Sequence, residues 1–205
     1  MNLTALCTQS HEIAKKSGFL DPPQTWEEVI ALIHSELSEA LEEYRKHRAL
    51  NEAYYEFKVP GVANKEAHTF ETLSRDEYLA LTPDARKGGK PCGIPSEFAD
   101  VVIRMAQYCG TIGWDLQKAY DENVRGKVVD KGTFLQLISG GHCYISSAYM
   151  SQIEVFPSRA VVYFALLIGE LEQFCERNDI NLSKAIEEKA LFNSTRSFRH
   201  GGKKV

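Results

Sequence analysis

Apolar residues recur at helical spacing along most of this 205-residue chain. They fall three and four residues apart, which places them on one face of a helix. Segments rich in glycine and proline separate the periodic stretches. The predicted helices cover residues 3–16, 25–50, 95–110, 116–128, 133–151, 157–177 and 182–194. No convincing strand alternation is visible, so the pattern predicts an all-α fold, a helical bundle.

Local signals refine the second helix and two weaker segments. Thr25 and Glu28 have the spacing of a capping box, which predicts where the second helix begins. Gly140-Gly141 interrupts the helical pattern of residues 133–151. Residues 51–94 have no regular pattern, which is typical of a functional lid or a disordered loop.

Three aromatic residues, Trp26, Tyr54 and Tyr55, are candidates to stack on a nucleotide base. Large aromatic residues more often pack in cores and under loops. Packing is therefore the favoured interpretation for each of them.

Two pairs of carboxylates occupy matching positions on two predicted helices. Glu36 and Glu39 lie three residues apart on one, and Glu97 and Asp100 lie three apart on the other, so each pair shares a helix face. At about 100° per residue, Glu36 lies roughly 75° from the centre of its apolar stripe, and Glu97 takes nearly the same angle on its own helix. Two antiparallel helices packed through these stripes would bring all four acids to one edge of the seam.

A cluster of four acids repels itself unless a cation neutralises it. Carboxylates suit Mg²⁺, which usually keeps substrate phosphate among its ligands. Solvated acids on helix surfaces are the alternative, and for any single residue that interpretation is favoured. A di-iron bundle would require Glu-x-x-His, which these helices lack.

These motifs resemble the MazG-like, all-α nucleoside triphosphate pyrophosphohydrolases. The family signature is Glu-x-x-Glu on one helix and Glu-x-x-Asp on a later one. Gly18-Phe19 also fits the family, and the resemblance covers about half of the chain. The closest stretches are residues 34–45 (HSELSEALEEYR), 90–104 (KPCGIPSEFADVVIR) and 188–203 (EKALFNSTRSFRHGGK).

The resemblance implies hydrolysis of a nucleoside triphosphate between its α and β phosphates, giving a monophosphate and pyrophosphate. Mg²⁺, with Mn²⁺ as an alternative, would be held by the four catalytic carboxylates, Glu36, Glu39, Glu97 and Asp100. One of these acids, or Glu43 one turn further along, would accept the proton of the attacking water.

The resemblance also gives the last helix a role. It implies that Lys189, Asn193 and Arg196 bind the substrate. Their spacing of four and three places them on one helix face, where cations and an amide suit phosphate oxygens. A solvated C-terminal helix end is the alternative, because positive charge is favourable there in any case.

An offset of 66 residues aligns part of the chain with itself. Phe98-Ala99 meets Phe164-Ala165, and Leu116–Ala119 meets Leu182–Ala185. This match predicts an internal, pseudo-dimeric duplication, although shared helical periodicity is an alternative explanation. An insertion at residues 133–177 is another.

On the duplication interpretation, residues 1–205 form a single domain of two unequal halves. Residues 1–130 are the acidic, metal-binding half. Residues 131–205 are a degenerate second half that carries the basic C-terminal helix. The resemblance also implies a homo-oligomer, with a dimer as the simplest form.

Composition and charge exclude some partners. The net charge of −4 argues against a nucleic-acid partner, which calls for a concentrated basic face. The longest apolar run, Ala160–Gly169, is about half of what a membrane span needs, so no membrane partner is expected. Five isolated cysteines and a start without a signal peptide indicate a reducing cytoplasm.

Two other functions compete with pyrophosphohydrolysis of simple nucleotides. Phosphoribosyl-ATP pyrophosphatase shares the superfamily chemistry, but its substrate is larger and carries a second phosphate. A non-catalytic helical interaction protein with a decayed site is a rival from a different class. The presence of all four acids argues against decay.

Overall fold

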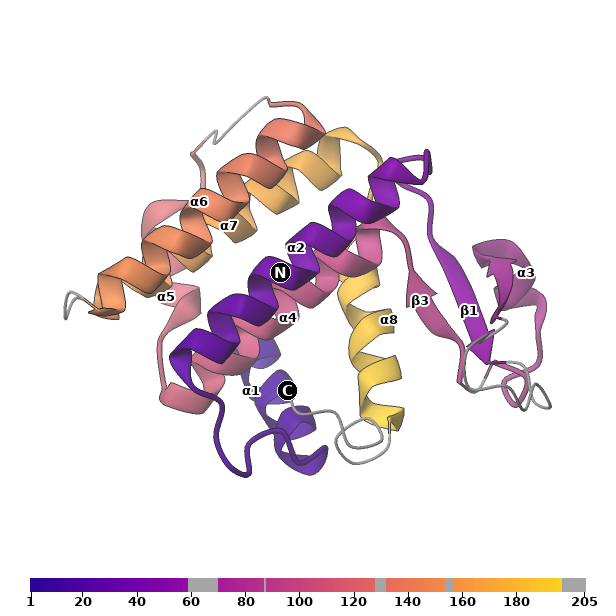
Figure 1. The fold of residues 1–205 in the computed structure, drawn as a ribbon, viewed down its shortest axis with the longest axis horizontal. Coiled ribbons are helices and arrows are strands. Elements are labelled where there is room, and N and C mark those ends of the chain that lie inside the picture. The colour runs from indigo at the N-terminus through magenta and orange to yellow at the C-terminus, as the bar shows by residue number, and fades with distance from the viewer. Residues whose placement is uncertain (59–69, 87, 128–131, 154–156, 197–205) are drawn as a thin grey trace.

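The computed structural model describes residues 1–58, 70–86, 88–127, 132–153 and 157–196. Within these ranges the protein is mostly helical and carries one small sheet (Figure 1). The basic tail at His200–Lys204 lies outside the described residues. The elements in chain order are α1 (Leu3–Lys16), α2 (Trp26–Arg45), β1 (Tyr54–Lys58), β2 (Phe70–Ser74), α3 (Arg75–Ala80), β3 (Lys90–Cys92), α4 (Ile94–Ile112), α5 (Leu116–Asn123), α6 (Phe134–Ile153), α7 (Pro157–Arg177) and α8 (Leu182–Thr195).

Helix α2 begins where the capping box predicts. The Thr25 hydroxyl accepts a hydrogen bond from the Glu28 backbone N–H at 3.2 Å, and Glu28 Oε2 accepts one from the Thr25 N–H at 2.8 Å. The helix ends at Arg45, not at residue 50 as predicted. His47 is left-handed, with a φ of 58°, which stops the helical backbone before residue 50.

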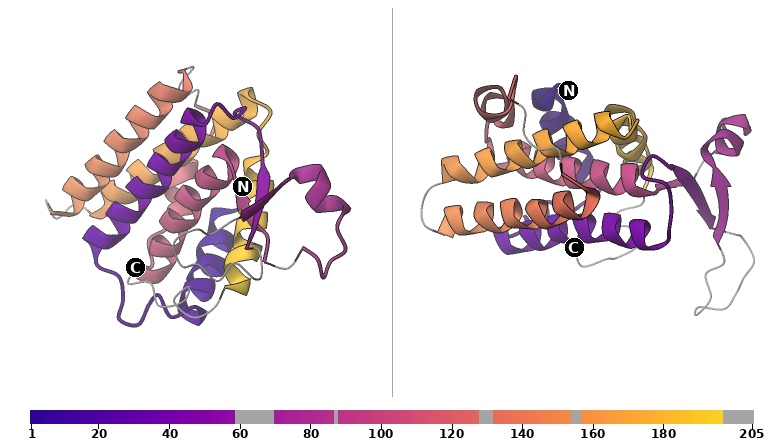
Figure 2. Two further views of the ribbon diagram at one scale, coloured as in Figure 1. Left: turned by 45° about the vertical axis from the view of Figure 1, so that its right-hand side comes forward. Right: turned by 90° about the horizontal axis from the view of Figure 1, so that it is seen from above.

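Residues 51–94 contain a three-stranded antiparallel sheet, which corrects the prediction of an irregular segment. The strand order is β2-β1-β3, with Tyr54 opposite Ser74 and Cys92. Short helix α3 begins at a capping box formed by Ser74 and Glu77. The sheet and α3 form an arm beside the helical body (Figure 2).

The helices of the two halves pair in matching ways. α2 packs along α4 and α6 packs along α7, while α2 and α6 contact each other between the two pairs. α8 packs on α4, and α5 packs on α7. The short helix of each half therefore lies against the long helix of the other. α1 covers a further face of α4 (Figure 1).

The core runs along these helix interfaces. Its largest fully buried side chains come from α1, α2, α4, α5, α6 and α7: Leu3, Ile33, Leu37, Ile94, Phe98, Met105, Leu116, Ile145, Phe164, Leu167, Ile168 and Leu171. The predicted apolar stripes therefore face one another across the seams. Among the described residues, no helix combines the length and the apolar character needed to cross a bilayer.

Helix α6 continues through Gly140 and Gly141, which interrupted its sequence pattern. A Cβ on Gly141 would lie 2.7 Å from Leu37 Cδ2 and 3.2 Å from Leu167 Cδ1. The absent side chain lets α6 approach α2 and α7 closely. The glycine that weakens the helical pattern thus serves the packing of three helices.

Candidate metal and phosphate site

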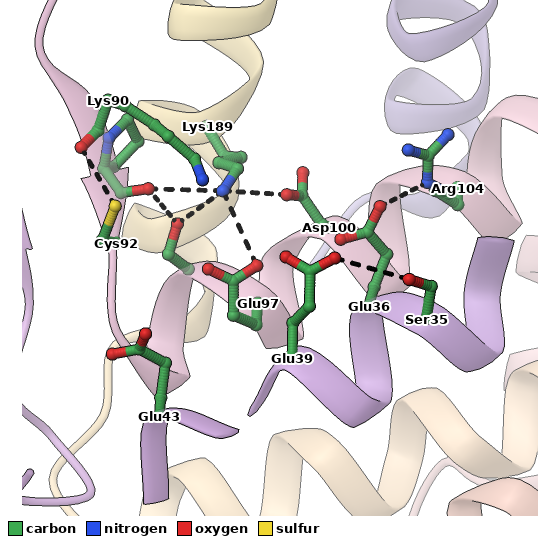
Figure 3. A network of polar contacts seen from close by, with 12 residues as sticks. Ser35, Glu36, Glu39, Glu43, Lys90, Cys92, Glu97, Asp100, Arg104 and Lys189 are labelled. Atoms are coloured by element: carbon green, nitrogen blue, oxygen red, sulfur yellow. Dashed lines mark hydrogen bonds and ion pairs between the residues drawn. The ribbon is translucent and has the colours of Figure 1, made fainter. Parts of the chain in front are cut away.

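Three of the four predicted acids converge between α2 and α4. One carboxylate oxygen from each of Glu36, Glu97 and Asp100 lies within 4.8 Å of the others. All three point into the seam between the helices (Figure 3). Glu39 lines the same cavity at its exposed edge, where its Oε1 accepts a hydrogen bond from Ser35 at 3.4 Å.

The local sequence explains this convergence. Leu37 and Ala40 on α2, and Phe98 and Ala99 on α4, are fully buried in the core, where α2 packs along α4. The acids stand on the shoulders of those stripes, as their helical angle predicts. Packing of the apolar stripes therefore brings the carboxylates together.

Burial gives the cluster unusual electrostatics. Burial, reinforced by the nearby Asp100 carboxylate, raises the pKa of Glu97 to about 8 against the opposing pull of Lys189. Burial and the Asp100 charge also raise the pKa of Glu36, which Arg104 partly offsets. Crowded carboxylates in a buried site favour protonation unless a cation is present. The cluster is therefore suited to a divalent cation.

Lys189 projects from α8 toward the acids and is buried. Its Nζ lies 2.8 Å from Asp100 Oδ2 and 3.9 Å from Glu97 Oε2, and the residue is 2% exposed. It also donates to Ser96 Oγ at 2.9 Å and to the Pro91 carbonyl at 3.3 Å. Burial lowers the pKa of Lys189, but the two carboxylates outweigh this and raise it.

The resemblance gives Lys189 a substrate-binding role, and in the structure it lines the cavity with its ammonium paired to Asp100. Asn193 on α8 and Arg196, which caps the end of α8 in an extended conformation, line the cavity and are half-buried, so the predicted helix face shared by the three residues does not extend to Arg196. Arg196 carries its guanidinium 5.6 Å from the ring centroid of Phe192. Burial lowers the pKa of Arg196.

Arg104 is a site residue that sequence reasoning missed. Its Nε donates to Glu36 Oε1 at 2.7 Å, its side chain is 30% exposed, and it lines the cavity. It lies four residues after Asp100, so the spacing of α4 already placed it on the acidic face. That spacing could have identified Arg104 as a site residue from the sequence.

Glu43 lies away from the cluster (Figure 3). It accepts hydrogen bonds from the Tyr54 hydroxyl at 3.1 and 3.0 Å and from Lys46 at 2.7 Å. It does not line the cavity. These contacts tie the end of α2 to the sheet and give Glu43 a structural role.

The acids open into a cavity of about 470 Å³ between α1, α2, α4 and α8. This volume falls in the range typical of small-molecule sites. Trp26, Tyr54 and Tyr55 are not among its lining residues. Trp26 packs against Tyr108, with ring centroids 5.0 Å apart, and both tyrosines are buried.

The residues at the charged end of the cavity fit a hard cation together with phosphate. Glu36, Glu97 and Asp100 offer oxygen ligands of the kind that Mg²⁺ prefers. Arg104 and Arg196 offer planar donors that match phosphate oxygens. A scan of protein-family models found no match for the chain, and searches of curated proteins and of solved structures returned none either.

Proposed function

We propose that this protein is a divalent-metal-dependent nucleotide pyrophosphohydrolase. The particular activity we propose is that of the MazG-like enzymes, in which a nucleoside triphosphate is cleaved into a monophosphate and pyrophosphate. The observation that carries the proposal is the group of three carboxylates within 4.8 Å, two of them buried and that of Asp100 half-buried, which line one cavity with two arginines.

Glu36, Glu97 and Asp100 are the residues that would hold Mg²⁺ or Mn²⁺, with Glu39 at the edge of the group. The bound ion would neutralise the triphosphate and lower the pKa of a water molecule. Arg104, Arg196 and Asn193 would bind and orient the phosphate oxygens. Lys189 would hold Asp100 in place through its 2.8 Å ion pair.

Glu39 is the acid best placed to accept the proton from water. It is exposed, lines the cavity and lies outside the group of three. A general base must reach the proton that it removes, and Glu36 and Glu97 are occupied within the buried cluster. We assign this role to Glu39 in preference to Glu43.

The duplication belongs to the same proposal, and three matched local features support it. Trp114 N donates to Cys109 O, and Ile180 N donates to Cys175 O, both at 2.9 Å. The Asp115 side chain caps the N–H of Lys118 and the Asn181 side chain caps that of Lys184, both at 2.9 Å. Left-handed backbone occurs at Gly113, with a φ of 75°, and at Asp179, with a φ of 55°.

The two members of each pair lie 66 residues apart in the sequence. Together with the matching helix pairs, they support a pseudo-dimer within one chain. The acids come from α2 and α4, and the basic helix α8 comes from the other half. We therefore propose one composite site per chain.

The test is a panel of ribo- and deoxyribonucleoside triphosphates incubated with Mg²⁺, with identification of the products. Release of pyrophosphate and a monophosphate supports the proposal. Turnover of phosphoribosyl-ATP alone would favour the rival pyrophosphatase. Binding of a partner protein without any turnover would favour a non-catalytic interaction module. Homo-oligomerisation stays a prediction, which light scattering of the purified protein tests.

A further inference from the structure

Helix α4 orders the cavity from charged to neutral. Glu97, Asp100, Arg104 and Gln107 all line it in turn. At 1.5 Å per residue, the ten-residue step from Glu97 to Gln107 spans about 15 Å. The charged groups occupy one end of this path, and a neutral amide stands at the other.

The wall beyond Arg104 is apolar and neutral. It is contributed chiefly by α1, the loop that follows it, and the facing positions of α2 and α4. Two aromatic rings, Phe19 and Phe192, belong to the lining. The apolar residues that line the whole cavity are Ile13, Ala14, Phe19, Leu32, Ile103, Ala190 and Phe192, the last two on α8. Such a surface suits a flat, uncharged ring.

Ser10 belongs to this wall and carries a buried hydroxyl that is unsatisfied. The residue is 4% exposed and lines the cavity. Among the described residues, its buried Oγ has no hydrogen-bond partner. A buried hydroxyl without a partner is destabilising, and native structures contain few of them. A ligand that bonds to Ser10 would explain why the hydroxyl is there.

Gln107 supplies a second polar group, and its amide is held in position. Its Nε2 donates to Gln24 Oε1 at 3.1 Å. With one amide hydrogen bound to Gln24, the side chain still offers its carbonyl oxygen and a second N–H. An amide that donates and accepts side by side is suited to the edge of a nucleobase.

We propose that Ser10 and Gln107 read the polar edge of the nucleobase at the neutral end of the cavity. Phe19, in the loop that follows α1, provides apolar surface for one of its faces. This inference rests on the proposed function, because the acids and arginines are taken as the triphosphate end. It assigns specificity to α1 and α4, and not to Trp26, Tyr54 or Tyr55.

The test is calorimetric binding of the four nucleoside 5′-monophosphates, with ribose 5-phosphate as a probe that lacks the base. We expect at least one monophosphate to bind about tenfold or more tightly than ribose 5-phosphate. Ser10→Ala and Gln107→Met should each weaken binding of that monophosphate about three- to tenfold, the loss of one hydrogen bond. Binding of ribose 5-phosphate should stay unchanged.

Matched controls lie on the exposed face of α1. Thr8→Ala removes a hydroxyl with one methyl group, and Gln9→Met removes an amide, from exposed residues that do not line the cavity. Both variants should bind the probes like the wild type. Ser10→Ala removes only an unpartnered oxygen, so this variant should fold, and its circular dichroism verifies that.

Two results would overturn the base-reading role. One is equal affinity for ribose 5-phosphate and every monophosphate. The other is that Ser10→Ala and Gln107→Met leave the affinity for the monophosphate unchanged, or change the affinity for all probes equally. Triphosphate hydrolysis with unchanged base recognition in both variants rejects this inference and leaves the proposed function standing. Base-dependent binding without any hydrolysis rejects the proposed function and leaves the base-reading role standing.

Discussion

Glu97→Gln should make the metal-free protein more stable. The Glu97 carboxyl is 4% exposed, and burial raises its pKa from an ordinary 4.5 to about 8. At pH 7 the unfolded chain ionises this group, whereas the folded protein keeps it mostly protonated. Because pH 7 lies about 2.5 units above the ordinary pKa, keeping the carboxyl protonated in the folded protein lowers the free energy of unfolding by about 3 kcal/mol. Glutamine has a similar shape and no charge, so it removes this loss.

The sign of the pH dependence follows from the raised pKa. The contribution of Glu97 to stability is fully present below pH 4.5 and is lost as pH rises to about 8. The gain from Glu97→Gln should therefore be small near pH 5 and reach a few kcal/mol near pH 8. Lys189 keeps its 2.8 Å ion pair with Asp100 in the variant.

Urea unfolding at several pH values, without divalent metal, measures this gain. Glu42→Gln on the exposed face of α2, where the side chain is 58% exposed, is the matched control and should change stability by less than about 0.5 kcal/mol. A Glu97→Gln variant that is less stable than the wild type at pH 8 would refute the reasoning. It would mean that Glu97 is a well-paired carboxylate and not a strained one.

Four further substitutions test the site and the packing of the helices. Arg104→Gln should lower kcat/KM for a nucleoside triphosphate about tenfold or more, because a charge-assisted hydrogen bond to phosphate contributes about 1.5–3 kcal/mol. Arg104→Lys should give an intermediate value. Unchanged steady-state kinetics would exclude the phosphate contact. Gly110→Ala should destabilise the fold by about 1–3 kcal/mol in thermal or urea unfolding, because the new Cβ would collide with the Cys7 carbonyl. A Cβ at Gly140 would meet only Glu170 Oε2, at 3.7 Å, so Gly140→Ala should stabilise the fold by up to about 1 kcal/mol. A loss of stability similar to that of Gly110→Ala would contradict this account. Burial lowers the pKa of His142, so its contribution to stability should be lost as pH falls below about 6.5. His142→Gln should therefore reduce the fall in the free energy of unfolding that the wild type shows between about pH 7 and 5. Parallel curves of stability against pH for the two proteins would contradict the shift in pKa.

The helices could be predicted because their information is local. Each core helix repeats its apolar residues at helical spacing, and Thr25 marks a boundary through a bond three residues away. The acidic convergence followed from the same periodicity, because stripe packing fixes what lies on the shoulders. That is why Glu36, Glu97 and Asp100 could be named before their distances were known.

The sheet could not be predicted by this route. Strand β2 is only five residues long, and its sequence, FETLS, has little apolar alternation. Its pairing with β1 depends on contacts distant in sequence, which weigh more for strands than any local preference. The capping box at Ser74 and Glu77 was a visible signal for α3.

The roles of Arg104 and Lys189 needed the tertiary structure for a similar reason. The bond from Arg104 to Glu36 joins residues 68 apart, and that from Lys189 to Ser96 joins residues 93 apart. Helical spacing shows which side chains share a face, but it does not show what faces them. The sequence could therefore name Lys189 as a cation suited to phosphate, but it could not show the ion pair of Lys189 with Asp100.

Product analysis by ³¹P NMR, with Mg²⁺ and a nucleoside triphosphate, tests the central claim most directly. Wild-type protein should release pyrophosphate and a monophosphate. Asp100→Asn, which removes one of the three converging carboxylates, should abolish that turnover while keeping the helical fold by circular dichroism. Release of a diphosphate and inorganic phosphate, or equal turnover in Asp100→Asn, would contradict the account.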